Sequence, residues 1–151
     1  MPDHVYVVLG AHRHLLEPEA GPAKIIINAN WQSGMGSSIS IAVKELRASY
    51  NAILIVLGDQ VAIQAKHLEA LVNVYKNKKS DLVCSRFNGT LGPPALFAGE
   101  KLKMLQALQG DKGAKQLLDN ENPIAIDLPV AGIDIDTRSH LAEYGNQIIQ
   151  R

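Results

Sequence analysis

Short runs of consecutive apolar residues constrain the fold of this chain more than any other feature. The strongest run is Ile53–Leu57 (ILIVL), and Val5–Leu9 (VYVVL) and Ile25–Asn28 (IIIN) are of the same kind. A strand with one face in water alternates apolar and polar residues, whereas a strand covered on both faces need not. These runs, together with Leu82–Ser85 (LVCS), predict strands of a mostly parallel sheet with helices on both faces. Four side chains of the strongest run are expected to be almost fully buried: Ile53, Ile55, Val56 and Leu57.

Segments with helical spacing of apolar residues lie between these strands. One covers residues 39–46, and Ser37 and Ser38 precede it as candidate N-caps. Another, Leu68–Tyr75, leads into Lys76–Lys79, whose positive charges suit the negative end of a helix dipole. The alternation of strands and helices predicts a three-layer α/β fold with right-handed crossovers.

The second half of the chain shows a different pattern. We expect a turn-rich loop at Phe87–Pro94, because Gly and Pro interrupt regular structure. Helical spacing returns at Leu102–Leu108 and Ala114–Leu118, a late strand is expected at Ala125–Leu128, and a last helix from about Arg138. Since no repeat or linker is visible in the 151 residues, we expect a single domain over residues 1–151.

Composition excludes several classes of function. The chain has 15 basic and 15 acidic residues, so it lacks the positive excess that a nucleic-acid groove needs. The single cysteine, Cys84, can form neither an intramolecular disulfide nor a cysteine-rich zinc site. His12 and His14 flank Arg13 in what we expect to be an exposed loop rather than a metal site. No apolar run approaches the roughly 20 residues of a membrane span, and the N-terminus lacks a signal-peptide pattern. We expect a soluble cytoplasmic protein with no nucleic-acid or membrane partner.

A carboxylate directly follows the strongest predicted strand. Asp59, in LGDQ, lies where open α/β sheets bind ligands, beyond the carboxyl ends of the strands. It can bind Mg²⁺ there, because this ion prefers hard oxygen ligands and keeps most of its water. In the alternative interpretation, Asp59 caps a helix that begins at about Ile63, and spacing alone favours neither.

A glycine-containing segment, residues 30–38, links a predicted strand to a predicted helix. Gly34 and Gly36 would let a ligand approach the backbone closely, and the helix start offers unpaired N–H groups. The segment fits neither a Walker loop nor a GxGxxG fingerprint. Taken alone, it is more typical of an ordinary strand-to-helix turn with serine caps.

A pair of carboxylates, Asp134 and Asp136, follows the late strand. At i and i+2 in an extended segment they point the same way, which could give a divalent ion two ligands. Alternatively, Asp136 or Thr137 caps the last helix, and taken alone this interpretation is favoured. The sequence contains no GxSxG elbow and no Ser/His/Asp set.

Six motifs occur in a characteristic order: VVLGA, NxxWxxGMGSS, LGDQ, FxGxxGxP followed by LF, LxGDxGAxxLL and DIDT. Together, from about Val5 to Leu141, they resemble the MobA-like nucleotidyltransferases. The sequence is most similar to the molybdenum-cofactor cytidylyltransferase branch, which transfers CMP from CTP to molybdopterin. The resemblance implies a Rossmann-like fold of the nucleotide-diphospho-sugar transferase type. It also implies attack of an acceptor phosphate oxygen on the α-phosphorus of a nucleoside triphosphate, with pyrophosphate leaving.

The resemblance implies roles for individual residues. Asp59 matches the family aspartate that binds Mg²⁺ and orients the triphosphate, Asp136 matches the second metal ligand, and Asp134 is a further candidate. Gly92 and Pro94 match the loop that faces the acceptor. One segment matches the loop near the nucleobase: Gly34, Met35, Gly36, Ser37 and Ser38.

The chain also departs from the family pattern. Family members begin with a strand and a loop of the form LAAGxSxRMGxxK, which holds the triphosphate, and the 151 residues contain no such loop. The missing strand would lie between Val5–Leu9 and Ile53–Leu57. Where this branch usually has His before the acceptor-loop proline, this chain has Pro93. Two functions therefore stay open: a Mg²⁺-dependent transferase of CMP or another NMP whose loop comes from elsewhere, and an inactive truncated relative that keeps a nucleotide or metal site.

Overall fold

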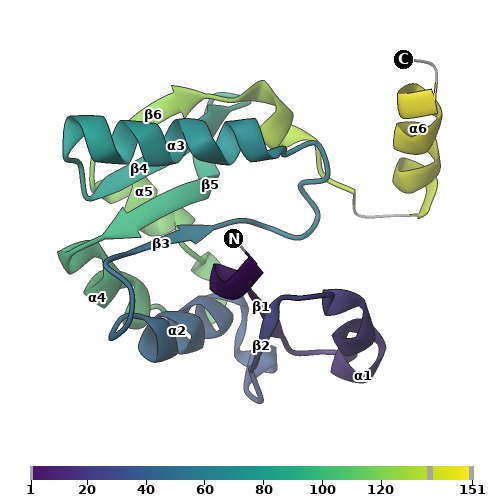
Figure 1. Ribbon diagram of the computed structural model, residues 1–151, viewed down its shortest axis with the longest axis horizontal. Coiled ribbons are helices and arrows are strands. Elements are labelled where there is room, and N and C mark those ends of the chain that lie inside the picture. Colours follow the sequence, from purple (N-terminus) through teal and green to yellow (C-terminus); the bar gives the residue numbers. More distant parts are fainter. Residues whose placement is uncertain (1, 136–137, 150–151) are drawn as a thin grey trace. The chain divides into compact units, whose positions relative to one another are not determined.

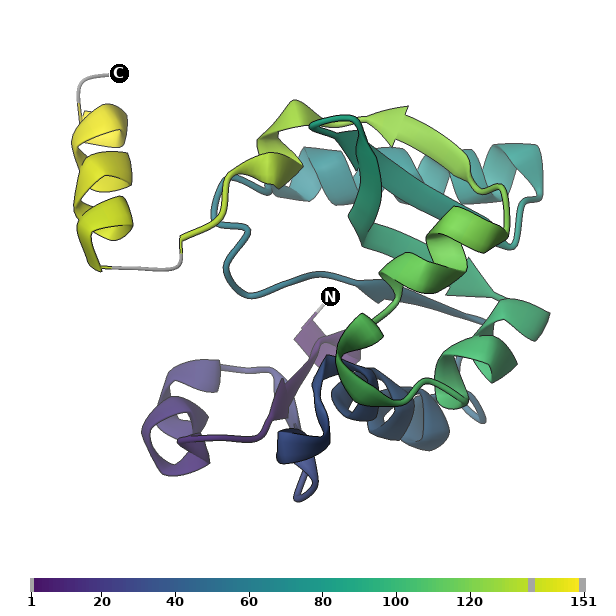
Figure 2. The same cartoon turned by 180° about the vertical axis from the view of Figure 1, so that it is seen from behind.

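The computed structural model describes residues 2–135 and 138–149, and Figures 1 and 2 show it from opposite sides. Its contacts divide the chain into two units. The first unit comprises Met1–Ile53 and Phe97–Asn122, and the second comprises Leu54–Leu96 and Pro123–Arg151.

The first unit contains a parallel pair of strands, β1 (Tyr6–Leu9) and β2 (Lys24–Ile27), which confirms the first two predicted strands. Its longest helix is α2 (Met35–Leu46), which packs against α4 (Glu100–Gln106). The apolar faces of these helices form the core of the unit, with Val43 and Leu105 almost fully buried. The remaining elements are η1 (Pro2–His4), α1 (Arg13–Leu16), η2 (Glu17–Ala20), η3 (Trp31–Ser33), η4 (Gly110–Lys112) and α5 (Lys115–Asn120).

A four-stranded sheet has the strand order β3 (Ala52–Ile55), β5 (Thr90–Ala98), β4 (Leu82–Phe87) and β6 (Ile124–Asp127). In the second unit β4 and β6 are parallel, and α3 (Ala65–Lys78) packs against β4, along one face of the sheet (Figures 1 and 2). The unit also contains η5 (Pro129–Gly132) and α6 (Arg138–Ile149). The predicted late strand and last helix are therefore confirmed.

The predicted burial of Ile53–Leu57 is wrong. In the part of the chain that the structure describes, β3 occupies one edge of the four-stranded sheet and ends at Ile55. Val56 is 42% exposed, and Ile53, Ile55 and Leu57 are half-buried. A continuous apolar run suits a strand in the interior of a sheet that is covered on both faces. Within the described sheet, β3 instead pairs with β5 alone and so lies at the edge.

The prediction of a loop at Phe87–Pro94 is also wrong, because this segment forms most of a β-hairpin. Asn88 and Gly89 join β4 to β5, and their φ angles are 50° and 70°. Two central residues with positive φ define the tight turn that best matches the twist of paired strands, and Asn-Gly is its preferred sequence. Gly92 and both prolines lie inside β5, which pairs with β4 in this hairpin, while the other edge of β4 pairs in parallel with β6.

The start of α2 and the short helix α1 concern two smaller expectations. Ser37 and Ser38 do not precede α2 as caps, because the helix begins at Met35 and its N-cap is Gly34. His12 and His14 are exposed as expected, although His14 lies in the short helix α1 rather than in a loop. Among the residues described, no helix is long and apolar enough to cross a membrane.

Candidate functional site

Asp59 follows β3 in an irregular segment that leads to α3. The N-cap of α3 is Gln64, whose backbone N–H donates to His67 Nδ1 at 3.0 Å in a reciprocal capping box. This finding rules out the interpretation of Asp59 as the cap of that helix. The carbonyl of Asp59 instead accepts hydrogen bonds from the backbone N–H groups of Val61, at 2.9 Å, and Ile135, at 3.2 Å. The backbone at Asp59 is therefore fixed, whereas its side chain is not committed to a structural role.

The carboxylate of Asp59 has an unsatisfied oxygen. Its Oδ1 is buried and has no hydrogen-bond partner within residues 2–135 and 138–149. Burying a carboxylate oxygen without a partner is costly, and a bound cation would remove that cost. A hard divalent cation fits this donor, since such ions prefer carboxylate oxygen.

The described chain does not supply a complete set of ligands around this oxygen. Within the described ranges, no three His, Cys, Asp or Glu side chains are grouped so that they could hold a metal ion. A cation at Asp59 would therefore take most of its remaining ligands from water and from a bound phosphate, which is how Mg²⁺ is usually held.

The segment around Ile135, which carries the other predicted metal ligands, is joined to Asp59 by a backbone hydrogen bond. Ile135, whose N–H bonds the Asp59 carbonyl, lies between Asp134 and Asp136 in the sequence. Asp134 is exposed. Asp136 and Thr137 lie outside the described residues, so the shared cation site of Asp59 and Asp136 stays a prediction.

Gln60, the residue after Asp59, is a buried polar residue. Its side chain is 4% exposed, and its Nε2 donates to the carbonyls of Pro93 and Ala131, both at 2.8 Å. Its Oε1 is buried without a partner in the described part of the chain. A polar residue next to an aspartate after a strand is typical of an exposed turn, so the sequence carried no signal of this burial.

The predicted nucleobase segment forms the start of α2 in the first unit. Asn28, 3% exposed at the end of β2, donates from Nδ2 to the hydroxyls of Ser37 and Ser38, at 2.8 and 2.9 Å. The hydroxyl of Ser37 in turn donates to the carbonyl of Gly34 at 2.7 Å. The Ser38 hydroxyl oxygen accepts the hydrogen bond from Asn28. The hydroxyl proton of Ser38 is not used in that bond and can be donated to a ligand. Met35, in the same segment, is 50% exposed.

The two glycines of this segment also have a packing role. Gly34 has φ 98°, and a Cβ there would lie 2.6 Å from the carbonyl carbon of Gly110 in η4. A Cβ at Gly36 would lie 2.8 Å from the carbonyl oxygen of Gly110. Both distances are shorter than real carbon contacts, so these positions require glycine for the close approach of η4.

The predicted acceptor residues lie in β5. A Cβ at Gly92 would lie 2.9 Å from Cζ of Phe87 on the paired strand, so the ring of Phe87 covers this glycine. Pro94 is fully buried, and its carbonyl accepts a hydrogen bond from Ser85 Oγ at 2.8 Å. Pro94 is therefore packed within the sheet and tied to β4 through its backbone.

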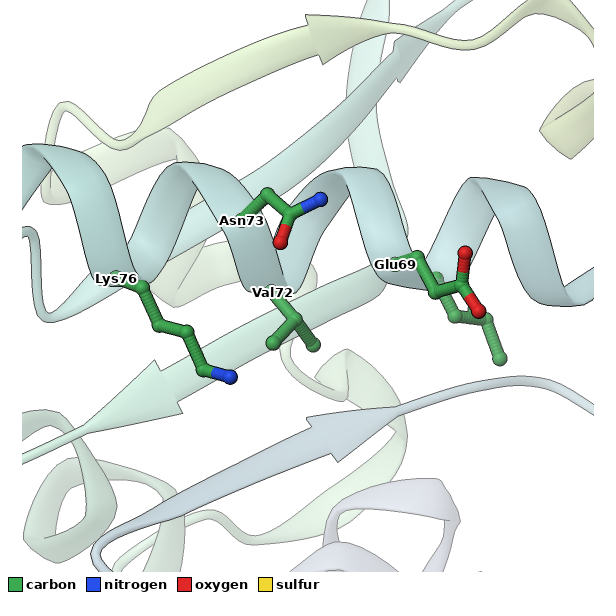
Figure 3. Close-up of a pocket in the computed structure, with 5 residues that line it drawn as sticks. Glu69, Val72, Asn73 and Lys76 are labelled. Carbon is green, nitrogen blue, oxygen red and sulfur yellow. The ribbon is translucent and has the colours of Figure 1, made fainter.

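A shallow pocket lies elsewhere in the second unit, along α3 (Figure 3). It contains none of the predicted site residues, and a single helix supplies all of its lining: Leu68, Glu69, Val72, Asn73 and Lys76.

Comparison with known proteins gives one family. A family model for the MobA-like NTP transferase domain matches residues 1–124. The purine catabolism protein PucB of Bacillus subtilis (strain 168) is 32% identical over 88 residues, which are 58% of this chain and 42% of PucB. Nicotine blue oxidoreductase of Paenarthrobacter nicotinovorans is 29% identical over 146 residues, 88% of this chain and 71% of that protein. The chain thus spans less than half of the length of PucB.

Solved structures share the fold. The manganese complex of Rv0371c from Mycobacterium tuberculosis H37Rv aligns with a TM-score of 0.72 and 20% identity, over 93% of this chain and 76% of that one. Molybdopterin-guanine dinucleotide biosynthesis protein A from Archaeoglobus fulgidus aligns with a TM-score of 0.64 and 16% identity, over 99% and 81%. These alignments confirm the predicted α/β fold class.

Proposed function

This chain belongs to the MobA-like NTP transferase domain family, and on that premise we propose that it binds a nucleoside triphosphate together with a divalent cation. Its reaction would be transfer of an NMP, with CMP favoured, to molybdopterin or a related phosphorylated acceptor. Two sequence similarities support this choice: LGDQ and DIDT at the metal positions, and GMGSS at the nucleobase position.

The observation that carries the proposal is the unsatisfied Oδ1 of Asp59. Asp59 would hold Mg²⁺ or Mn²⁺, with Asp136 as the second protein ligand and Asp134 as a further candidate. The manganese complex of Rv0371c supports the use of a divalent ion by this fold. When bound, such an ion neutralises phosphate charge and so lowers the barrier to attack on the α-phosphorus.

The remaining roles rest on this chain's own residues. We propose that residues 34–38 contact the nucleobase, where backbone groups and the Ser38 hydroxyl can read its polar edge. Asn28 supports this role, because its two donated hydrogen bonds hold both serines in one arrangement before any ligand arrives. Gly92 and Pro94 would shape the strand that faces the acceptor.

A second candidate function, for the 151 residues by themselves, is nucleotide binding without catalysis. These residues contain no LAAGxSxRMGxxK loop. By themselves they would keep the cation and base contacts but lack the amide groups, Arg and Lys that fix a triphosphate.

A binding panel tests the proposed function. The 151-residue chain is titrated calorimetrically with CTP, GTP, ATP and UTP, each with and without Mg²⁺. We expect weak binding that requires the cation and is tightest for CTP. Equal binding of all four nucleotides would remove the CTP preference, and binding that is indifferent to Mg²⁺ would contradict the cation site.

A further inference from the structure

Asp59 lies between a loosely packed neighbour and a firmly anchored one. A Cβ placed on Gly58 would meet no atom within 4 Å, so nothing packs against that side of the residue. Gln60, on the other side, is buried and bonded to two different elements. No hydrogen bond to Oδ1 from a described residue holds the Asp59 carboxylate in place. Its position therefore depends on its backbone neighbours.

The hydrogen bonds of Gln60 define the orientation of its amide. Both contacts at 2.8 Å are backbone carbonyl oxygens, which accept and never donate. The nitrogen must face them, because the reverse orientation would set the amide oxygen against two acceptors. Both protons of the amide are thus used, one on Pro93 in β5 and one on Ala131 in η5.

These contacts join three segments of the second unit. Gln60 connects the end of β3 to β5, which holds the predicted acceptor residues, and to η5, which precedes Asp134. A second link in the same place is the hydrogen bond from the Ile135 N–H to the Asp59 carbonyl. Both links hold the backbone on the C-terminal side of the Asp59 Cα, from which the carboxylate extends.

The amide of Gln60 leaves one of its own atoms unsatisfied while it satisfies two carbonyls. Its Oε1 is buried without a partner among the described residues, whereas its Nε2 donates to the carbonyls of Pro93 and Ala131. An apolar side chain of the same length would remove the first cost but would leave both carbonyls without this donor. The amide is therefore the group that connects β5 and η5 to the segment carrying Asp59.

We propose that Gln60 is a positioning residue for the cation site of Asp59, holding that carboxylate in place through its bonds to β5 and η5. The inference rests on the proposed function, because it takes Asp59 as the cation ligand. Groups that orient a metal ligand typically matter about 10- to 100-fold in metal affinity.

The test measures Mn²⁺ binding to the full chain by electron paramagnetic resonance, in which the signal of free Mn²⁺ falls as the ion binds. Gln60→Met keeps the length of the side chain and removes both donors. Gln60→Asn keeps the amide but withdraws it by one methylene, and it carries the test if the methionine variant does not fold. The matched control is Ser85→Ala, which also loses one buried bond of 2.8 Å to β5, at the carbonyl of Pro94.

We expect the Gln60 variants to bind Mn²⁺ about 10-fold or more weakly, and Ser85→Ala to bind it as the unsubstituted chain does. Thermal unfolding without metal shows whether each variant is folded. Unchanged Mn²⁺ affinity in a folded Gln60 variant would overturn the inference and leave the Asp59 site intact. An equal loss in Ser85→Ala would also overturn it, since general loosening of β5 would then explain the effect. No Mn²⁺ binding by the unsubstituted chain would overturn the proposed cation site, and the role of Gln60 with it.

Discussion

Replacing Asp59 by alanine should abolish cation-dependent nucleotide binding while leaving the free energy of unfolding nearly unchanged. The carboxylate, in the segment that follows β3, is the proposed protein ligand of the ion. Its removal would leave water in its place in the coordination of the ion. No described hydrogen bond to Oδ1 is lost, because none exists. We expect any loss in the free energy of unfolding to stay within about 0.5 kcal/mol, because the substitution removes a buried oxygen whose burial without a described partner is itself unfavourable.

Two measurements check this prediction together. Water-proton relaxation in the presence of Mn²⁺ and CTP reports the bound ion, and urea unfolding reports stability. Asp59→Asn is the matched control, because it keeps the shape of the side chain and removes its charge, and it should weaken Mn²⁺ binding nearly as much. An alanine variant that binds Mn²⁺ and CTP like the unsubstituted chain would rule out Asp59 as the ligand. A large loss of stability would show that the carboxylate has a structural role.

The second large effect concerns turnover. The 151-residue chain should release negligible pyrophosphate from CTP, even with Mg²⁺ and molybdopterin present. Negative charge in the transition state spreads over the α-phosphate and the departing pyrophosphate, and preorganised donors must meet it. Loss of one such donor can cost about 10²- to 10³-fold in rate, and here a whole donor loop, with its Arg and Lys, is absent from the 151 residues.

The comparison that isolates this effect uses two chains. One is the 151-residue chain, and the other is the same chain preceded by a strand and loop of the form LAAGxSxRMGxxK. We expect the extended chain to release pyrophosphate at least about 10²-fold faster. Robust CMP transfer by the unextended chain would contradict this account, and would mean that another segment or a neighbouring subunit holds the triphosphate.

The elements of this fold were predictable where local pattern decides them. Apolar runs located β1, β2, β4 and β6, and helical spacing located α2 and α3, because each has a face that must be buried. The edge position of β3 was not predictable. The apolar pattern of Ile53–Leu57 is compatible with full burial. Whether Val56 is in fact buried depends on which strands pair, and the pattern does not contain that information.

The hairpin was missed for a different reason. Gly and Pro in Phe87–Pro94 are typical of a loop, but Asn88-Gly89 between two strands is a strong local hairpin signal. Residues 90–98 form a strand that includes Gly92 and both prolines. The ring of Phe87, on the paired strand, covers the glycine.

The candidate site was predictable in part. The position of Asp59 after a strand indicated a ligand site, but only the capping of α3 by Gln64 removed the competing interpretation. Asn28 and Gln60 stand in the quoted motifs NxxWxxGMGSS and LGDQ, but the sequence does not show what their side chains bond. Gln60 reaches carbonyls 33 and 71 residues away, and such contacts appear only once the fold is known.

The most direct test of the central claim is the coupling between cation and nucleotide in the unsubstituted chain. Mn²⁺ is titrated into the protein with and without saturating CTP, and the affinity for the ion is compared. If the triphosphate completes the coordination of a cation at Asp59, CTP should raise the Mn²⁺ affinity of the protein, by a factor within the roughly 5- to 150-fold range typical of coupled sites, and Mn²⁺ should raise the affinity for CTP by the same factor. Mn²⁺ binding that CTP leaves unchanged would contradict the claim that the two ligands share a site.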